Sequence, residues 1–207
     1  MSFFDRAARF IDDVLLLPED LREELEQAEA ALARGKATTA EMQLRGVLAE
    51  RPSLLRARQA LALALEAQRR YPEAREVVRF SRHLDPDEPE VALLAARLAL
   101  ADDQPEEAIV EARDAARQLA SAGGPAFAEA CVLRARAERA LGRPDRAGRE
   151  LRKALAATPE DVALRLELAA AYAEAGQAPR AGRAVATLSA ADLDPSPALR
   201  VGRLLLR

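Results

Sequence analysis

The side chains best suited to catalysis or metal binding are few and widely separated in this 207-residue sequence. His83 is the only histidine and Cys131 the only cysteine. One imidazole and one thiol cannot supply the four ligands of a structural zinc site, and the sequence offers no base that could activate the thiol. We therefore expect His83 to be an exposed or capping side chain near a helix end, and Cys131 to be a small buried core residue.

Other signatures of chemistry are absent from the sequence. Neither a GxxxxGK[ST] nor a GxGxxG loop occurs, so no segment is suited to cradling a phosphate. Adjacent carboxylates such as Asp12–Asp13 and Asp102–Asp103 are interpreted as solvated groups at helix ends. The sequence predicts a protein that is not an enzyme and that has no catalytic residues, no metal site and no cofactor.

Composition narrows the class of protein further. Hydrophobic residues make up 50% of the chain and aromatic residues only 3%, with 31% charged residues and a net charge of −3. An acidic chain with so few aromatic side chains is not expected to bind nucleic acid. No stretch approaches the roughly 20 apolar residues of a membrane span. The lone cysteine and the lack of a signal-peptide core favour a cytoplasmic location, and the excess of Arg and Ala is typical of a GC-rich bacterial genome.

Five short segments share a turn that is followed by an alanine. These alanines are separated by 34, 34, 39 and 34 residues, and the odd interval contains an insertion, Ser121–Pro125, which we expect to lengthen one connection. Ala- and Leu-rich windows without internal Gly or Pro, such as residues 91–100, predict helices. The alanines are Ala40, Ala74, Ala108, Ala147 and Ala181.

Local sequence around these turns agrees with paired helices. Prolines occur where the second helix of a pair should begin, a position at which the missing N–H costs nothing; they are Pro72, Pro105, Pro144 and Pro179. Three of the turns carry a glycine, Gly35, Gly142 and Gly176, where a positive φ is expected. Arg69 and Asp103 take that place in the other two turns, which should therefore be strained or differently shaped.

The 34-residue period and its markers resemble the tetratricopeptide repeat family. A second small residue stands twelve positions before each marker alanine, and the aromatic Tyr71 and Tyr172 also match the family pattern. The consensus Trp is missing throughout, since the chain contains none. The resemblance implies an all-α fold, a right-handed α-solenoid of antiparallel helix pairs. About five degenerate repeats would cover residues 21–195, namely 21–54, 55–88, 89–127, 128–161 and 162–195.

Both ends of the chain extend beyond the repeats. Residues 1–20 predict an amphipathic helix with an apolar face that contains Phe3, Phe10, Ile11 and Val14. This helix could cover the first repeat, dock on a partner or mediate dimerisation, and the sequence leaves these alternatives open. Residues 196–207 predict a C-terminal capping helix or the start of a sixth repeat.

The resemblance also implies which residues face a partner. In the tetratricopeptide family the first helix of each pair lines a concave groove. Leucines and arginines at these positions could hold an amphipathic helix or an extended peptide that carries acidic residues. In an equally weighted alternative, Glu90 and Glu129 neutralise the arginines and the leucines pack against neighbouring helices. The groove residues are Leu25, Arg56, Gln59, Leu63, Leu93, Arg97, Leu100, Val132, Arg136, Arg139 and Leu166.

Two functions follow from these patterns. The first is a non-catalytic scaffold or adaptor that binds other proteins through the groove. The second is a structural or regulatory subunit of a larger assembly, which docks or forms a homo-oligomer through its terminal helices. The sequence names no partner.

Overall fold

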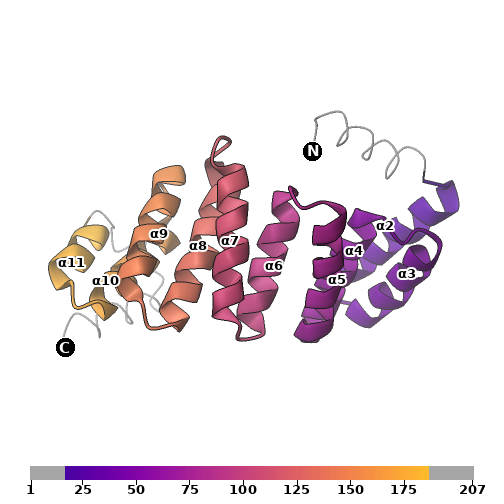
Figure 1. The fold of residues 1–207 in the computed structure, drawn as a ribbon, viewed down its shortest axis with the longest axis horizontal. Coiled ribbons are helices and arrows are strands. Elements are labelled where there is room, and N and C mark those ends of the chain that lie inside the picture. Colours follow the sequence, from indigo (N-terminus) through magenta and orange to yellow (C-terminus); the bar gives the residue numbers. More distant parts are fainter. Residues whose placement is uncertain (1–16, 187–207) are drawn as a thin grey trace. The chain divides into compact units, whose positions relative to one another are not determined.

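Ten α-helices account for nearly all of the chain that the computed structural model describes, residues 17–186. The part described contains no strand, so the all-α prediction is confirmed there (Figure 1). The predicted helices at residues 1–20 and 196–207 lie largely outside the described residues. The helices are α2 (Glu19–Ala33), α3 (Ala37–Glu50), α4 (Leu55–Ala67), α5 (Tyr71–Leu84), α6 (Pro89–Ala101), α7 (Pro105–Leu119), α8 (Gly124–Ala140), α9 (Pro144–Ala157), α10 (Val162–Glu174) and α11 (Ala178–Val185).

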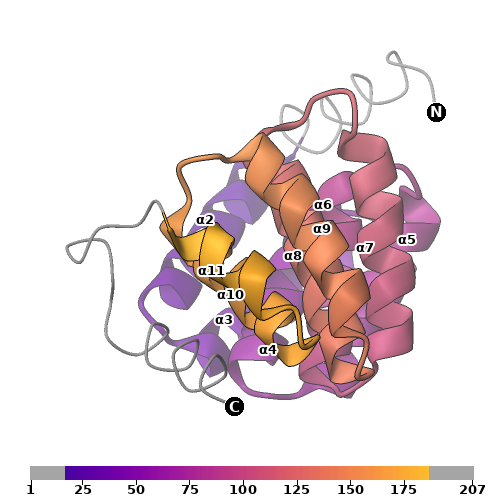
Figure 2. The ribbon, with the colours of Figure 1, turned by 90° about the vertical axis from the view of Figure 1, so that its left-hand side faces the viewer.

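The helices fall into two compact units, Met1–Asp102 and Asp103–Arg207. In the first unit each helix from α2 to α6 packs on the next one along the chain, and α2 also contacts α4. In the second unit α7 to α11 pack consecutively in the same way, as Figure 2 shows from the side of α10 and α11. The boundary between the units falls between the two helices of the third predicted repeat. None of the described helices is long and apolar enough to cross a membrane.

Alanine makes the close packing of these helices possible. A helix pair can approach only where the side chains at the contact are small, and a larger side chain there would overpack the contact. The marker alanines of the second helices and the small residues of the first helices are all completely buried. They are Ala40, Ala74, Ala108, Ala147 and Ala181 in the second helices, and Ala28, Ala62, Ala96, Ala135 and Ala169 in the first.

The turns inside the pairs share one backbone geometry despite their different residues. Gly35, Gly142 and Gly176 have φ values of 75°, 69° and 71°, as predicted. Arg69 and Asp103 adopt φ values of 59° and 55°. These two turns are therefore strained and not reshaped, because a residue with a Cβ is held in the left-handed region. The geometry is kept because it lets the following N–H groups cap the carbonyls at the end of the first helix.

The four prolines at the starts of second helices occupy the first turns of α5, α7, α9 and α11, as predicted. The insertion at 121–125 behaves differently from the prediction. The connection from α7 to α8 covers only residues 120–123, the same length as 51–54, 85–88 and 158–161 between other pairs. The additional residues instead begin α8 early, with Gly124 and Pro125 in its first turn. The insertion lengthens a helix because Pro at this position starts a helix at no cost.

A buried carboxylate joins the first two helix pairs. Glu41 on α3 is 5% exposed and accepts hydrogen bonds from Arg70 Nη1 at 2.7 and 2.8 Å and from Gln68 Nε2 at 2.7 Å. Arg45 Nη2 lies 2.9 Å from the same carboxylate. Burial raises the pKa of Glu41, but the hydrogen bonds from Gln68 and Arg70 and the charges of both arginines outweigh it, so the pKa lies below its ordinary value.

The next junction uses the same two positions, with a base in place of Glu41 and an acid in place of the neutral Gln68. Arg75 stands 34 residues after Glu41, and it forms an ion pair with Asp102, which stands 34 residues after Gln68. An acid on the earlier repeat is thus replaced by a base. A shifted repeat would place Glu41 against Asp102, two like charges, so the contacts favour one order of the repeats.

Candidate binding surface

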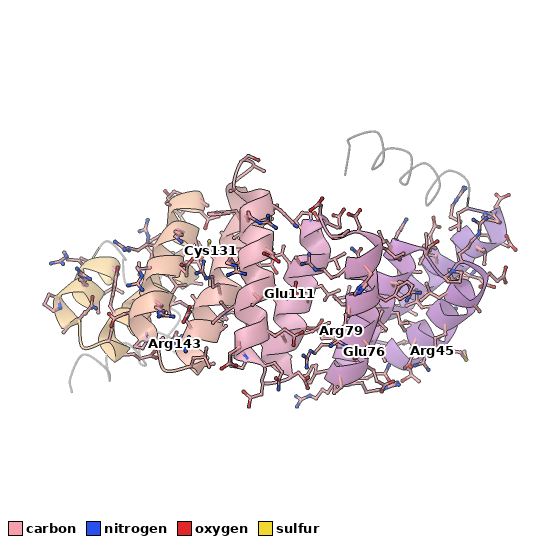
Figure 3. All side chains as sticks on the ribbon, viewed as in Figure 1. Arg45, Glu76, Arg79, Glu111, Cys131 and Arg143 are labelled. Carbon is pink, nitrogen blue, oxygen red and sulfur yellow. The ribbon has the colours of Figure 1, made fainter. Side chains whose placement is uncertain are left out.

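The two residues best suited to chemistry have the surroundings that the sequence predicts. His83 is exposed near the end of α5, where its Nδ1 lies 2.8 Å from the backbone oxygen of Arg79. Cys131 on α8 is 1% exposed and belongs to the core of the second unit (Figure 3). Burial, aided by the charge of Glu150, raises the pKa of its thiol to about 11, so little of the reactive thiolate forms near neutral pH. The described residues contain no group of three His, Cys, Asp or Glu suited to a metal ion.

The apolar line predicted for the groove is mostly part of the core. Leu25, Leu93, Val132 and Leu166 are 2%, 6%, 9% and 5% exposed. Leu25 packs in the core of the first unit and Val132 in that of the second. These side chains stabilise helix packing, as the alternative interpretation expects, and offer little area to a partner.

Three other predicted groove residues keep part of their surface accessible. Gln59 and Leu63 on α4 and Leu100 on α6 are half-buried, and Leu63 also packs against the core of the first unit. All three belong to the first unit. Among the predicted groove residues, the apolar surface that a partner could still contact therefore lies on α4 and α6.

Arg56 is held by a carboxylate of the preceding repeat. Its Nε and Nη2 donate to the two carboxylate oxygens of Glu29 on α2, at 2.7 and 2.6 Å. This hydrogen-bonded contact with Glu29 raises the pKa of Arg56 above its ordinary value. Because Glu29 neutralises its charge, Arg56 attracts a second carboxylate less strongly than an unpaired arginine does.

Arg136 and Arg139 on α8 are held from the following repeat. Arg136 Nη2 donates to Glu167 at 2.7 Å, and Arg139 Nε donates to Glu174 at 2.9 Å. Both acids lie on α10. The arginines are neutralised as one interpretation expects, but by different acids from the Glu90 and Glu129 that it named.

These partners could have been found by searching for opposite charges about one repeat apart. The pairs Arg56–Glu29, Arg136–Glu167 and Arg139–Glu174 are separated by 27, 31 and 35 residues. Glu29 is itself on the groove face, opposite a residue of the neighbouring first helix. A search limited to one helix considers only residues three or four apart and misses such pairs.

Arg97 differs from the other predicted groove arginines. Its side chain is exposed on α6, and no ion pair or hydrogen bond joins it to the rest of the described chain. Leu100 is one helical turn further along the same helix, so the free guanidinium and a half-buried leucine share a face. Leu63 occupies on α4 the position that Arg97 occupies on α6, 34 residues later. We call Arg97, Leu100, Leu63 and Gln59 the α4–α6 face and treat these residues as a candidate binding surface.

Comparison with known proteins agrees with the helix pairs. Residues 138–203 match the sequence model of the tetratricopeptide repeat family. No curated protein matches the chain in sequence.

Solved structures of similar fold come from several organisms. MamA from Desulfovibrio magneticus RS-1 is 15% identical with a TM-score of 0.73, over 82% of this chain and 93% of that one. PilF from Pseudomonas aeruginosa is 19% identical with a TM-score of 0.75, over 90% and 83%. A thermophilic tetratricopeptide protein from Thermus thermophilus is 22% identical with a TM-score of 0.64, over 90% and 100%. At these identities the likeness concerns the fold. The chain is thus similar to the tetratricopeptide repeat family in sequence over residues 138–203, and its described helices share the fold of these solved structures.

Proposed function

We propose that this protein is a non-catalytic scaffold that binds a partner through the first helices of its repeats. Proteins of this fold are interaction modules, so a protein partner is the general expectation. The finer proposal is that the α4–α6 face is a principal contact, and that the partner presents an acidic side chain next to apolar ones on a helix or an extended peptide.

The unpaired guanidinium of Arg97 is the observation that carries this proposal. An exposed arginine with its donors free can bind a carboxylate through two hydrogen bonds. Leu100 and Leu63 supply partly exposed apolar surface on the same two helices. All donors of Arg97 are available to a partner carboxylate, whereas Glu29 already neutralises the charge of Arg56.

An acidic partner gains little binding free energy at arginines that already form ion pairs within the chain. Arg136 and Arg139 already hold carboxylates from α10, so replacing these partners exchanges one ion pair for another. We therefore assign them a positioning role, in which they join α8 to α10, and place the acid-binding contact at Arg97.

The composition of the chain also supports a proposal about its cellular compartment and its source. The Arg- and Ala-rich composition with a single buried cysteine supports a cytoplasmic bacterial protein. A net charge of −3 and the scarcity of aromatic side chains support protein partners over nucleic acid. Fractionation of the source cells, with the chain detected by antibody, tests the compartment.

Photo-crosslinking tests the binding face directly. A photoreactive amino acid is placed at Gln59 on the α4–α6 face, and in a matched chain at Met42, which is 70% exposed on α3. We expect a partner to be captured from Gln59 and not from Met42. The captured partner is then titrated against Arg97→Glu and against Arg51→Glu, an equal charge change at the exposed end of α3. A loss of affinity of about tenfold or more is expected only for Arg97→Glu. Equal capture from both sites, or unchanged affinity of Arg97→Glu, would refute the proposal.

A further inference from the structure

The outward face of α9 is almost uniformly basic. Arg146, Arg149, Arg152 and Lys153 are exposed, while Ala147, Leu151 and Ala154 on the opposite side are completely buried. Neither Arg149 nor Arg152 has an ion pair or hydrogen bond with another described residue. The other two bases reach buried acids of their own unit, Arg146 at 4.0 Å from Glu138 and Lys153 at 3.1 Å from Glu150.

The outward faces of α5 and α7 carry acids beside their bases. On α5, Arg79 pairs with Glu76, and on α7, Arg117 lies 3.9 Å from Asp114. In both cases the acid stands three residues before the base, so the outward face neutralises itself. On α9 the acids near Arg146 and Lys153, Glu138 and Glu150, are buried, and the exposed Asp145 accepts a hydrogen bond from Gln177. The exposed side chains of α9 are therefore mostly basic, and this face suits a negatively charged surface.

A complementary surface exists on the first described helix of the same chain. The outward face of α2 carries the exposed acids Glu19, Glu23 and Glu26, while Leu21, Leu25 and Ala28 are buried on the other side. The exposed base on this face, Arg22, donates a hydrogen bond to the backbone oxygen of Leu17. Glu19 and Glu23 form no ion pair or hydrogen bond with another described residue. Glu26 contributes to the charge around Arg56 but remains exposed.

The two charged ridges have the same spacing when one is read backwards. From Glu26 to Glu23 to Glu19 the steps are three and four residues, and from Arg146 to Arg149 to Lys153 they are also three and four. Residues three, four and seven apart lie on one face of a helix, and both ridges span about 10 Å. Antiparallel docking would place Glu26 opposite Arg146, Glu23 opposite Arg149, and Glu19 opposite Lys153.

We propose that the chain associates head to tail, with the α2 ridge of one copy bound antiparallel to the α9 ridge of a second copy. The α2 ridge is Glu19, Glu23 and Glu26, and the α9 ridge is Arg146, Arg149 and Lys153. The occupant is a second copy because the same chain carries both surfaces with matching charge and spacing. The contact joins different surfaces, so each copy leaves one ridge free and the assembly can grow.

The electrostatic character of the contact determines how it should behave. Exposed ion pairs are individually weak and are screened by salt. We therefore expect weak association that increases with protein concentration and weakens about tenfold between about 0.05 M and about 0.5 M NaCl. An interaction confined to one molecule would show no dependence on protein concentration.

Charge reversal with rescue tests the pairing. Sedimentation equilibrium of the full chain at low salt is compared for the wild type, Arg146→Glu/Arg149→Glu and Glu23→Arg/Glu26→Arg. Each variant alone should be monomeric, because it presents two ridges of like charge. An equimolar mixture should associate again, since each variant then meets a complementary ridge. The control Arg113→Glu/Arg117→Glu makes the same charge change on α7 and should associate like the wild type.

Single variants keep the test independent of folding defects. Arg149→Glu and Glu23→Arg alter side chains without partners in the described chain, and circular dichroism verifies their helix content. Each alone should weaken association and the mixture should restore it. A wild type that stays monomeric at low salt, or charge-reversed variants that associate as it does, would overturn the proposal. Partner binding at the α4–α6 face uses other helices, so Arg97→Glu should leave self-association unchanged.

Discussion

Replacing Arg69 by glycine should stabilise the protein, although the change removes a whole side chain. Arg69 ends the turn after α4 with a φ of 59°. Its side chain is exposed and forms no ion pair or side-chain hydrogen bond with another described residue. The substitution therefore relieves backbone strain without removing a contact.

The magnitude follows from two opposing terms. A residue with a Cβ costs about 1–2 kcal/mol in the left-handed region, while glycine adds about 0.5–1 kcal/mol of unfolded-chain entropy. The net gain for Arg69→Gly is about 0.5–1 kcal/mol. Asp103→Gly should gain less, because Asp tolerates this region better than Arg.

The reverse substitution isolates the same effect. Gly142 has a φ of 69°, and a Cβ added there would meet nothing within 4 Å. Gly142→Ala should therefore cost about 1 kcal/mol through the backbone alone. Gly35→Ala, at a φ of 75° and with equally open space, provides an independent repeat of the measurement in the first unit.

Thermal and urea unfolding measure these changes. For a chain of this size about 1 kcal/mol corresponds to about 2–4 °C in Tm, provided that circular dichroism and fluorescence of an attached dye report one transition. Arg69→Gly should raise Tm and Gly142→Ala should lower it. If Arg69→Gly destabilises the protein or Gly142→Ala is neutral, the turns do not carry the strain that we infer.

Three further predictions concern the helix interfaces. Glu41→Gln should cost about 2 kcal/mol of stability at neutral pH because it weakens a buried charged network. Since folding lowers the pKa of Glu41, its contribution to stability is present above the ordinary pKa of 4.5 and is lost as the pH falls through the folded-state value. Urea titrations should therefore show that the stability difference between the two proteins shrinks in acid. The thiol of Cys131 should not react with Ellman's reagent in the native protein and should react fully once the chain is unfolded in urea; rapid labelling of the folded chain would contradict its burial. Gly46→Ala should stabilise α3 by about 0.5–1 kcal/mol because a Cβ there meets open space. Gly148→Leu should cost about 1–3 kcal/mol because even a Cβ would lie 3.1 Å from the Tyr172 ring. Equal effects of the two substitutions in thermal unfolding would contradict this difference.

The helix pairs could be predicted from sequence because their determinants are local. The turn geometry, the proline at the start of a second helix and the small residue at each contact all recur within one 34-residue period. The position of the insertion could be predicted from the sequence, but the prediction that it lengthens a connection was wrong. Its effect depends on whether the extra residues become part of a helix. Pro125 can begin α8 one turn early, and the connection keeps its ordinary length.

The candidate binding surface was predicted less well because it depends on neighbours about one repeat away. The positions on the first helices were chosen from the repeat register alone. Only the tertiary structure decides that Leu25 and Val132 are buried, and that Arg56 forms an ion pair with Glu29. It also decides that Arg97 has no such partner among the described residues. Charge type and register do not distinguish Arg97 from Arg136, because the difference lies in what the adjacent helix presents.

By itself the sequence determined the helix pairs, their repeated turns and the burial of the marker alanines, since each follows from residue type and a short period. The tertiary structure decided which charged side chains form ion pairs with neighbouring repeats and which remain unpaired among the described residues. The physical reason is that an ion pair between stacked helices requires two residues about one repeat apart to face each other within about 4 Å. Packing of the helices sets that distance. The free side chains of Arg97 and Arg149 are therefore features of the folded protein, and the two binding proposals rest on them.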